Sequence, residues 1–186
     1  MYIKTMNTWI SLLRGINVGG KNVIKMDALI HLYEKLGFKD ARSYLQSGNV
    51  IFRSDEEDPV NIGNLITTRL KMDFGMEVSV FALSPGTLEK ILENNPFLKD
   101  PLKDPTHQYI TFLFSEVERH ELNIFGDAMR EGEDIVVSKS AVYLFLPGGY
   151  GRTRLSNNFL ENKLEVSATT RSLKTAYSIL HQSIEL

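Results

Sequence analysis

The sequence contains no cysteine. A chain without thiols forms neither a disulfide framework nor a cysteine-ligated zinc or iron–sulfur centre, and it has no thiol nucleophile. Long apolar runs are also missing. The run from Trp9 to Leu13 lies between Lys4 and Arg14, which makes it too short for the apolar region of a signal peptide or for a membrane span. We therefore expect a cytoplasmic protein without a membrane segment.

An excess of charge of one sign is lacking as well, because 21 Lys and Arg face 23 Asp and Glu, for a net charge of -2. This near balance excludes a globally basic protein that coats nucleic acid, although it is compatible with a local basic patch. The 4 histidines are scattered and no two have the spacing of metal ligands, so we expect neither a metal site nor a cofactor.

The first half of the chain alternates between strand and helix patterns. Gly37 stands where a left-handed helix C-cap is expected, Ser84 is a candidate helix N-cap, and Gly48 lies in a turn between two predicted strands. The order is β, α, β, β, α, β and a further helix, which is the split βαβ pattern of ferredoxin-like folds. The predicted elements are strands at 8–13, 43–46, 50–53 and 77–81, and helices at 26–36, 62–70 and 84–92.

The second half repeats this order after a proline-punctuated linker at 95–105. The sequence thus predicts an α+β fold of two tandem ferredoxin-like (βαββαβ) lobes with antiparallel sheets, each followed by an extra helix. The lobes comprise residues 1–95 and 96–186; one compact duplicated domain is the alternative. The predicted elements are strands at 109–114, 135–138, 142–146 and 166–170, helices at about 118–129 and 155–164, and a final helix with Ser172 as its candidate N-cap.

A glycine-rich segment follows the first strand. Residues 15–22 read G-x-x-x-x-G-K-N, which is one residue short of a phosphate-binding P-loop because Asn22 replaces the Ser or Thr that reaches Mg²⁺. The helix also begins too late for its amides to meet a phosphate. We interpret this segment as a connector rather than as part of a nucleoside triphosphatase. In a split βαβ lobe, however, the first strand and the hairpin reach one end of the sheet, so that candidate ligand-binding residues converge there: Arg14, Asn17, Lys21, Ser47 and Asn49.

A second glycine cluster at 147–154 leads into the helix at 155–164. Arginines beside the free amides of a helix N-terminus form a site suited to an anion. The alternative is a solvated basic turn whose arginines pair with acids such as Glu161. The predicted topology brings the exit of the next strand to the same end. The candidate ligand-binding residues in this lobe are Gly149, Gly151, Arg152, Arg154, Ser156, Asn157, Thr170 and Arg171.

These features favour a cytoplasmic protein that binds a small anionic, phosphorylated molecule through its glycine-rich basic loops. One alternative is an enzyme that acts on a phosphorylated or nucleotide substrate, for which the sequence identifies no acid or base. Another is an RNA- or protein-binding module. The strands show no aromatic signature typical of RNA binding, so nucleic acid is not the favoured partner. Catalytic residues and oligomeric state stay open.

Four ordered stretches carry a family resemblance. They are residues 12–22, residues 46–52, residues 149–157 and Ala168-Thr169-Thr170-Arg171. They resemble the signature stretches of DUF1697, a widespread bacterial family of unknown function, over nearly the whole chain. The resemblance implies a two-lobed α+β fold related to the ferredoxin-like arrangement, and it implies no activity, substrate or catalytic residue. The chain departs from the family pattern at Ser172-Leu173, where Asn, often followed by Trp, is expected.

Overall fold

The computed structural model describes residues 5–118 and 122–186, and these form two compact units. One unit comprises Met1–Glu89 with Ile179–Leu186, and the other comprises Lys90–Ser178. The boundaries fall within α3 (Pro85–Glu93) and α5 (Leu173–Ile184), so both helices contribute residues to each unit. Among the described helices, none has both the length and the apolar character needed to cross a membrane.

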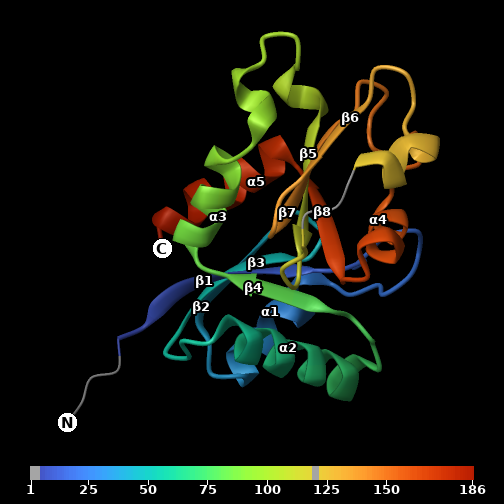
Figure 1. The fold of residues 1–186 in the computed structure, drawn as a ribbon. Helices are drawn as coiled ribbons and strands as arrows, with labels where there is room; N and C mark the ends of the chain where they lie inside the picture. Colours follow the sequence, from blue (N-terminus) through green and yellow to red (C-terminus); the bar gives the residue numbers. More distant parts are fainter. Residues whose placement is uncertain (1–4, 119–121) are drawn as a thin grey trace. The chain divides into compact units, whose positions relative to one another are not determined.

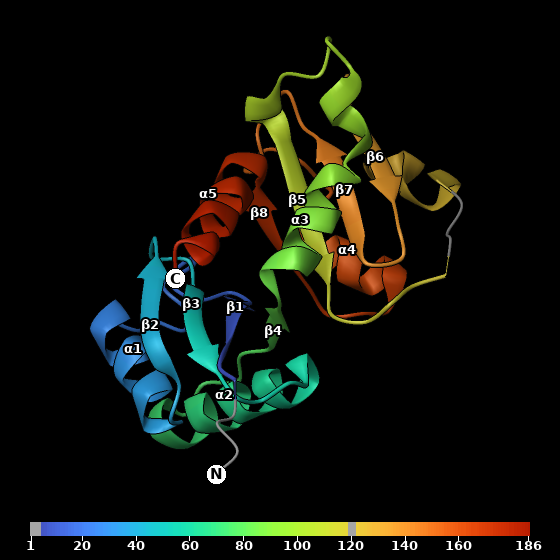
Figure 2. The same cartoon turned by 90° about the vertical axis from the view of Figure 1, so that its left-hand side faces the viewer.

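The first unit is built on a four-stranded antiparallel sheet with the strand order β2-β3-β1-β4. Two helices, α1 (Met26–Lys35) and α2 (Pro59–Phe74), lie on one face of this sheet (Figure 1 and Figure 2). The strands are β1 (Asn7–Leu13), β2 (Lys39–Tyr44), β3 (Asn49–Ser54) and β4 (Val80–Leu83).

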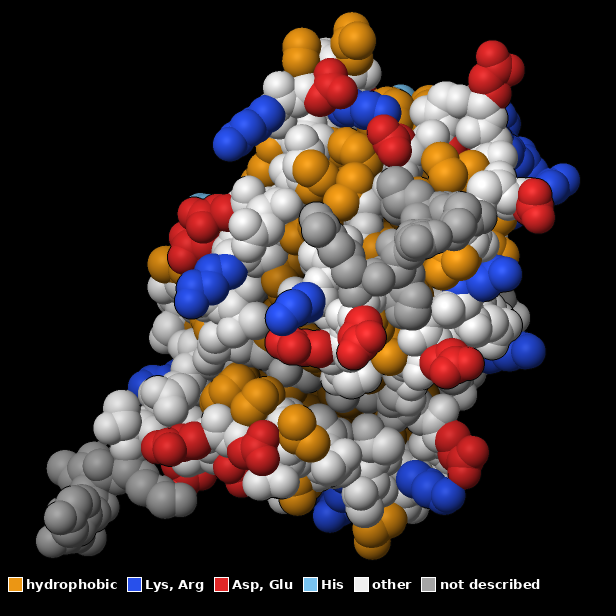
Figure 3. All heavy atoms as spheres, in the orientation of Figure 1, with side chains coloured by type: hydrophobic (Ala, Val, Ile, Leu, Met, Phe, Trp, Pro, Cys, Tyr) orange, Lys and Arg blue, Asp and Glu red, His pale blue; other side chains and the backbone are white. Residues whose placement is uncertain are grey.

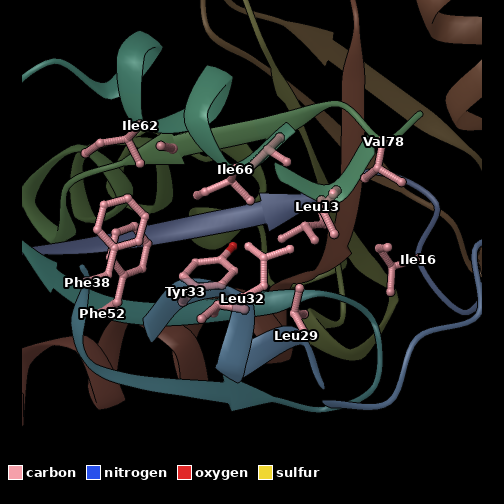
Figure 4. Packing of buried hydrophobic residues seen from close by; sticks show 14 of the residues in the cluster. Leu13, Ile16, Leu29, Leu32, Tyr33, Phe38, Phe52, Ile62, Ile66 and Val78 are labelled. Atoms are coloured by element: carbon pink, nitrogen blue, oxygen red, sulfur yellow. The ribbon is translucent and has the colours of Figure 1, made fainter. Parts of the chain in front are cut away.

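Aromatic side chains form the centre of the core between this sheet and its helices (Figure 4). The rings of Phe38 and Phe52 stack with their centroids 4.6 Å apart, and the ring of Tyr33 meets Phe52 edge-on at 5.2 Å. The hydroxyls of Tyr33 and Ser11 share a hydrogen bond of 2.6 Å, and both residues are fully buried. Burial raises the pKa of the Tyr33 phenol well above its ordinary value, and the hydrogen bond to Ser11 acts in the opposite direction.

The helix ends follow the capping rules from which they were predicted. Gly37 adopts a φ of 86° after α1, and the N–H groups of Gly37 and Phe38 donate to the carbonyls of Glu34 and Tyr33, as in a Schellman motif. The prediction of a left-handed C-cap at Gly37 is therefore confirmed. Ser84 is also confirmed as an N-cap, because its Oγ accepts a hydrogen bond of 3.1 Å from the Thr87 N–H.

Two strands of this unit differ from their predicted positions. The strand expected at 43–46 is β2 (Lys39–Tyr44), an edge strand with a bulge where Asp40 has a φ of 53°. The strand expected at 77–81 begins only at Val80, because Val80 is the first residue whose register partner, Leu13, lies within β1. Both predictions were wrong in position because a strand begins where a neighbouring strand offers hydrogen-bond partners. The alternation of apolar and polar residues along the sequence does not show where that is.

The second unit has its own four-stranded antiparallel sheet, with the strand order β6-β7-β5-β8. The α+β class, with two antiparallel sheets, is thus confirmed. The predicted helix at 118–129 is wrong in type: a 3₁₀ helix, η3 (Leu122–Ala128), occupies part of it, while residues 119–121 of that prediction lie outside the described residues. The strands are β5 (Gln108–Leu113), β6 (Asp134–Val137), β7 (Ala141–Phe145) and β8 (Ala168–Ser172); α4 (Asn157–Leu164) follows β7, and the 3₁₀ helices η1 (Pro96–Lys99) and η2 (Pro105–His107) precede β5.

The segment before β5 is fixed by two buried amides. Asn95 donates from Nδ2 to Gln108 Oε1 at 2.9 Å, and Gln108 donates from Nε2 to the Lys103 carbonyl at 2.7 Å. The Lys103 ammonium lies 4.5 Å from the centre of the Phe145 ring and 2.9 Å from a carboxylate oxygen of Asp134. The two amides and the Lys103 ammonium therefore stabilise the fold of this segment.

Candidate anion-binding site

The glycine-rich segment of the first unit closes on itself as a tight turn. The Lys21 N–H donates to the Val18 carbonyl at 3.1 Å, and the Asn17 N–H donates to the Asn22 carbonyl at 3.2 Å. Gly15, Asn17, Gly19, Gly20 and Asn22 all adopt positive φ. Because α1 begins only at Met26, this turn does not lead its amides into a helix N-terminus, as a P-loop does.

The side chain of Asn17 ties this turn to the neighbouring hairpin. Its Nδ2 donates to the carbonyls of Ile24 at 3.0 Å and Gln46 at 2.9 Å, and its Oδ1 accepts the Ile24 N–H at 2.8 Å. The Asn17 side chain thus forms hydrogen bonds with the backbone of the segment before α1, at Ile24, and with the backbone of the hairpin, at Gln46. Such a position makes Asn17 a structural residue.

The other predicted residues of the first unit are partly gathered at the same place. Asn49 is fully buried, and its Nδ2 donates to the Tyr44 carbonyl at 2.9 Å and to Ser47 Oγ at 3.0 Å. The Arg14 N–H donates to the Ser79 carbonyl at 3.0 Å, and Lys21 is exposed. The structure therefore brings Asn17, Ser47 and Asn49 to the end of the sheet, where hydrogen bonds within the protein engage all three.

The glycine cluster of the second unit is an exposed turn after β7. Gly149 has a φ of 79°, its carbonyl accepts the Arg152 N–H at 3.1 Å, and both Gly151 and Arg152 are exposed. Tyr150 turns inward, and its ring centroid lies 5.5 Å from that of Tyr109. The turn is thus anchored by one aromatic side chain and leaves Arg152 in solvent.

A chain of polar contacts connects the start of α4 to β8. Asn157 Nδ2 donates to the Ala168 carbonyl, Asn157 Oδ1 accepts the Thr170 hydroxyl at 2.9 Å, and the hydroxyls of Thr170 and Thr111 lie 2.8 Å apart. Ser156 Oγ accepts the Phe159 N–H at 3.3 Å and caps the helix. The predicted residues Ser156, Asn157 and Thr170 therefore lie together, and they hold α4 against the sheet.

Arg171 has different surroundings from the other two arginines of the predicted site. It is buried, and its Nη1 donates to Thr169 Oγ1 and to the Thr170 carbonyl, each at 2.8 Å. Burial lowers the pKa of the Arg171 guanidinium to about 10, which leaves it charged at neutral pH. Burial raises the pKa of the nearby Tyr150 phenol above its ordinary value. Arg152 and Arg154, in contrast, are exposed.

Arg154 lines a surface pocket of about 230 Å³ between η3 and α4. The two elements contribute side chains in a regular pattern. On α4, Leu160 and Leu164 are buried, and the residues that precede them, Phe159 and Lys163, line the pocket. On η3, Phe125 and Ala128 are buried, at the three-residue spacing of a 3₁₀ helix. The complete lining is Ile124, Asp127, Ala128, Arg154, Phe159 and Lys163.

The position of Arg154 follows from its neighbours in sequence. Leu155 is fully buried and Ser156 caps α4, so the chain is fixed directly after Arg154 and presents this residue at the edge of the pocket. Lys163 lies one turn after Phe159, with its ammonium 5.8 Å from the centre of that ring. Neither cation forms an ion pair with a described residue. The pocket therefore combines two cations with an apolar floor.

The sequence pointed to Arg154 but missed the other residues of the pocket. Lys163 and Phe159 show only the ordinary pattern of an amphipathic helix, and Asp127 lies in a segment predicted to be a longer α-helix. No group of three or more His, Asp or Glu side chains among the described residues is arranged to hold a metal ion. The charged groups that line this pocket are the Arg154 guanidinium, the Lys163 ammonium and the Asp127 carboxylate.

Comparisons with known proteins bear on the fold and the family. A comparison with curated proteins finds no match. The chain is similar to a solved structure, that of the conserved bacterial protein SP0830 from Streptococcus pneumoniae, with a TM-score of 0.71 and 24% identity. That match covers 96% of this chain and 99% of the other, and it supports the fold alone. Residues 6–143 match the family described as "Protein of unknown function (DUF1697)", and the chain belongs to this family.

Proposed function

We propose that the second unit binds a small anionic molecule in the pocket between η3 and α4. The observation that carries this proposal is the pair of cations, Arg154 and Lys163, which line one pocket without an ion pair to a described residue. An anion between them would gain two charge-assisted contacts, and α4 places its positive end close to Arg154. Phosphate and carboxylate groups both have this chemistry.

The charges on one face of the molecule do not favour a nucleic acid as the ligand. On the face that Figure 3 shows, basic and acidic side chains are interspersed, without a continuous basic stripe. A protein that binds nucleic acid through its phosphates usually presents such a stripe. The enzymatic alternative and the RNA- or protein-binding alternative stay predictions. The same is true of a role in ligand binding for the other residues predicted from the sequence: Arg14, Asn17, Lys21, Ser47, Asn49, Gly149, Gly151, Arg152, Ser156, Asn157, Thr170 and Arg171.

The experiment is a thermal titration of the full chain with inorganic phosphate at constant ionic strength, so that general screening does not imitate binding. A ligand at ten times its Kd stabilises the folded protein by about 1.4 kcal/mol, which raises the melting temperature measurably. Arg154→Gln and Lys163→Gln should each remove most of this response. Lys139→Gln is the matched control, because Lys139 is an exposed lysine of the same unit outside the pocket.

Two results would contradict the proposal. If phosphate raises the melting temperature equally in the wild type and in the Arg154 and Lys163 variants, the anion binds outside this pocket. If phosphate, acetate and a phosphorylated small molecule all leave the melting temperature unchanged, the proposal of an anion site is wrong. Arg152→Gln, tested in the same way, shows whether the exposed glycine-rich turn also contributes to binding.

We also infer that the two units are duplicated ferredoxin-like βαββαβ units. Two observations support this: the sheets have the corresponding orders β2-β3-β1-β4 and β6-β7-β5-β8, and a helix or 3₁₀ helix follows the first strand of each. Superposition of residues 8–83 on residues 107–171 in an experimentally determined structure tests the inference. Strands that superpose only in a different order would contradict it.

A further inference from the structure

The pocket between η3 and α4 contains an acid as well as two cations. Asp127 lines the same 230 Å³ as Arg154 and Lys163. Opposite charges on a surface usually approach one another when their side chains can reach, yet Asp127 forms no ion pair with either cation or with another described residue. The pocket is therefore lined by positive and negative groups that do not pair with one another.

The floor of the pocket between these charges is apolar. Ala128 is 6% exposed, while Ile124 and Phe159 are half-buried and turn part of their surface toward the pocket. The Phe159 ring packs in turn on the fully buried Phe125, with 6.4 Å between ring centroids, which fixes its position. A bare inorganic anion would leave this apolar surface in contact with water, whereas a ligand with a hydrocarbon part would cover it.

The size of the pocket limits the ligand to a small molecule. At about 230 Å³ it lies below the range of roughly 300–1,000 Å³ that is typical of pockets for drug-sized ligands. The ligand that matches all three properties is small and carries a negative group, a positive group and an apolar group.

We infer that this pocket binds a free apolar α-amino acid as its zwitterion, an inference that rests on the proposed anion site and names its ligand class. Arg154, assisted by Lys163, binds the α-carboxylate, because a guanidinium matches the two oxygens of a carboxylate. Asp127 accepts hydrogen bonds from the α-ammonium group. The hydrocarbon side chain lies on Phe159 and Ile124.

Three related ligands test this assignment in calorimetric titrations of the full chain. L-leucine carries both charges, N-acetyl-L-leucine lacks the ammonium group, and L-leucinamide lacks the carboxylate. We expect L-leucine to bind at least tenfold more tightly than either analogue. Asp127→Asn should abolish the preference for L-leucine over N-acetyl-L-leucine, and Arg154→Gln should abolish its preference over L-leucinamide.

Glu131→Gln is the matched control for the acid, because Glu131 is an exposed carboxylate of the same unit that does not line the pocket. This variant should keep the full preference for L-leucine. Asp127 is exposed, so its replacement should leave the melting temperature of the free protein unchanged.

The outcomes separate this inference from the proposed function. If N-acetyl-L-leucine binds as tightly as L-leucine and Arg154→Gln weakens both, the pocket is an anion site and the zwitterion is excluded. If L-leucinamide binds as well as L-leucine and only Asp127→Asn matters, both the zwitterion and the anion site are wrong. The same holds if neither these ligands nor inorganic phosphate bind.

Discussion

Replacement of Gly48 by alanine should destabilise the protein far more than a typical glycine-to-alanine change. Gly48 has a φ of 71°, and a Cβ at this position would lie 2.8 Å from Leu13 Cβ and 3.2 Å from Ile16 Cβ. Left-handed backbone costs a non-glycine residue about 1–2 kcal/mol. Leu13 and Ile16 are fully buried, so their displacement adds an overpacking cost of about 1–3 kcal/mol. We expect Gly48→Ala to lower the free energy of unfolding by about 2–5 kcal/mol.

Gly15→Ala isolates the steric part of this effect. Gly15 has a nearly identical φ of 68°, but nothing lies within 4 Å of the Cβ that would be added there. The backbone cost and the reduced entropy of the unfolded chain are therefore the same in both variants, and the difference between them reports the clash. Urea unfolding with unchanged m-values measures both free energies. Two variants that agree within about 0.5 kcal/mol would refute the reasoning, because the clash would then cost nothing.

Three further predictions concern polar groups of the first unit. Asn17→Ala removes three hydrogen bonds and should lower the free energy of unfolding in urea by about 1–3 kcal/mol; an unchanged value would show that these bonds are not needed. Tyr33→Phe should cost about 0.5–1.5 kcal/mol near neutral pH. Burial raises the pKa of Tyr33, so the wild type loses stability as the pH rises above about 10, whereas the Tyr33→Phe variant does not. The stability deficit of the variant should therefore stay constant up to about pH 9 and shrink between about pH 10 and about pH 11. A deficit that grows in this range would contradict the reasoning. Lys21→Ala should leave any affinity for ATP and Mg²⁺ unchanged, and a tenfold loss, about 1.4 kcal/mol, would restore the P-loop interpretation.

The class of the fold was predictable because local signals agree with it. Apolar spacing identified α1 and α2, and the turn at Gly48 correctly predicted a hairpin between β2 and β3. The boundaries of β2 were not predictable in the same way. As an edge strand it carries Lys39 and Asp40 at its start, without the apolar alternation that marks a strand with one buried face.

The candidate pocket was less predictable than the fold. Arg154 stood out because it follows a glycine cluster and precedes a helix. Lys163 and Asp127 join it only because η3 packs beside α4, a tertiary contact between segments some thirty residues apart in sequence. Hydrophobic periodicity and sequence motifs describe residues that are close along the chain. A pocket that is lined by two separate elements therefore cannot be recognised from either of them.

Glycine-rich segments with basic residues have two physical uses, and this chain separates them. Around residues 15–22 the turn is closed by its own backbone bonds, and the polar side chain of Asn17 is consumed in tying it to the hairpin. Around residues 147–154 the turn is tied down by Tyr150 and by buried Leu155, which leaves Arg154 to face solvent at a pocket. Hydrogen-bonding capacity already satisfied within the protein contributes nothing to a ligand, so the two glycine segments are not equivalent candidates. The exposed Arg154 beside the pocket is the reason why we propose the anion site at the second segment.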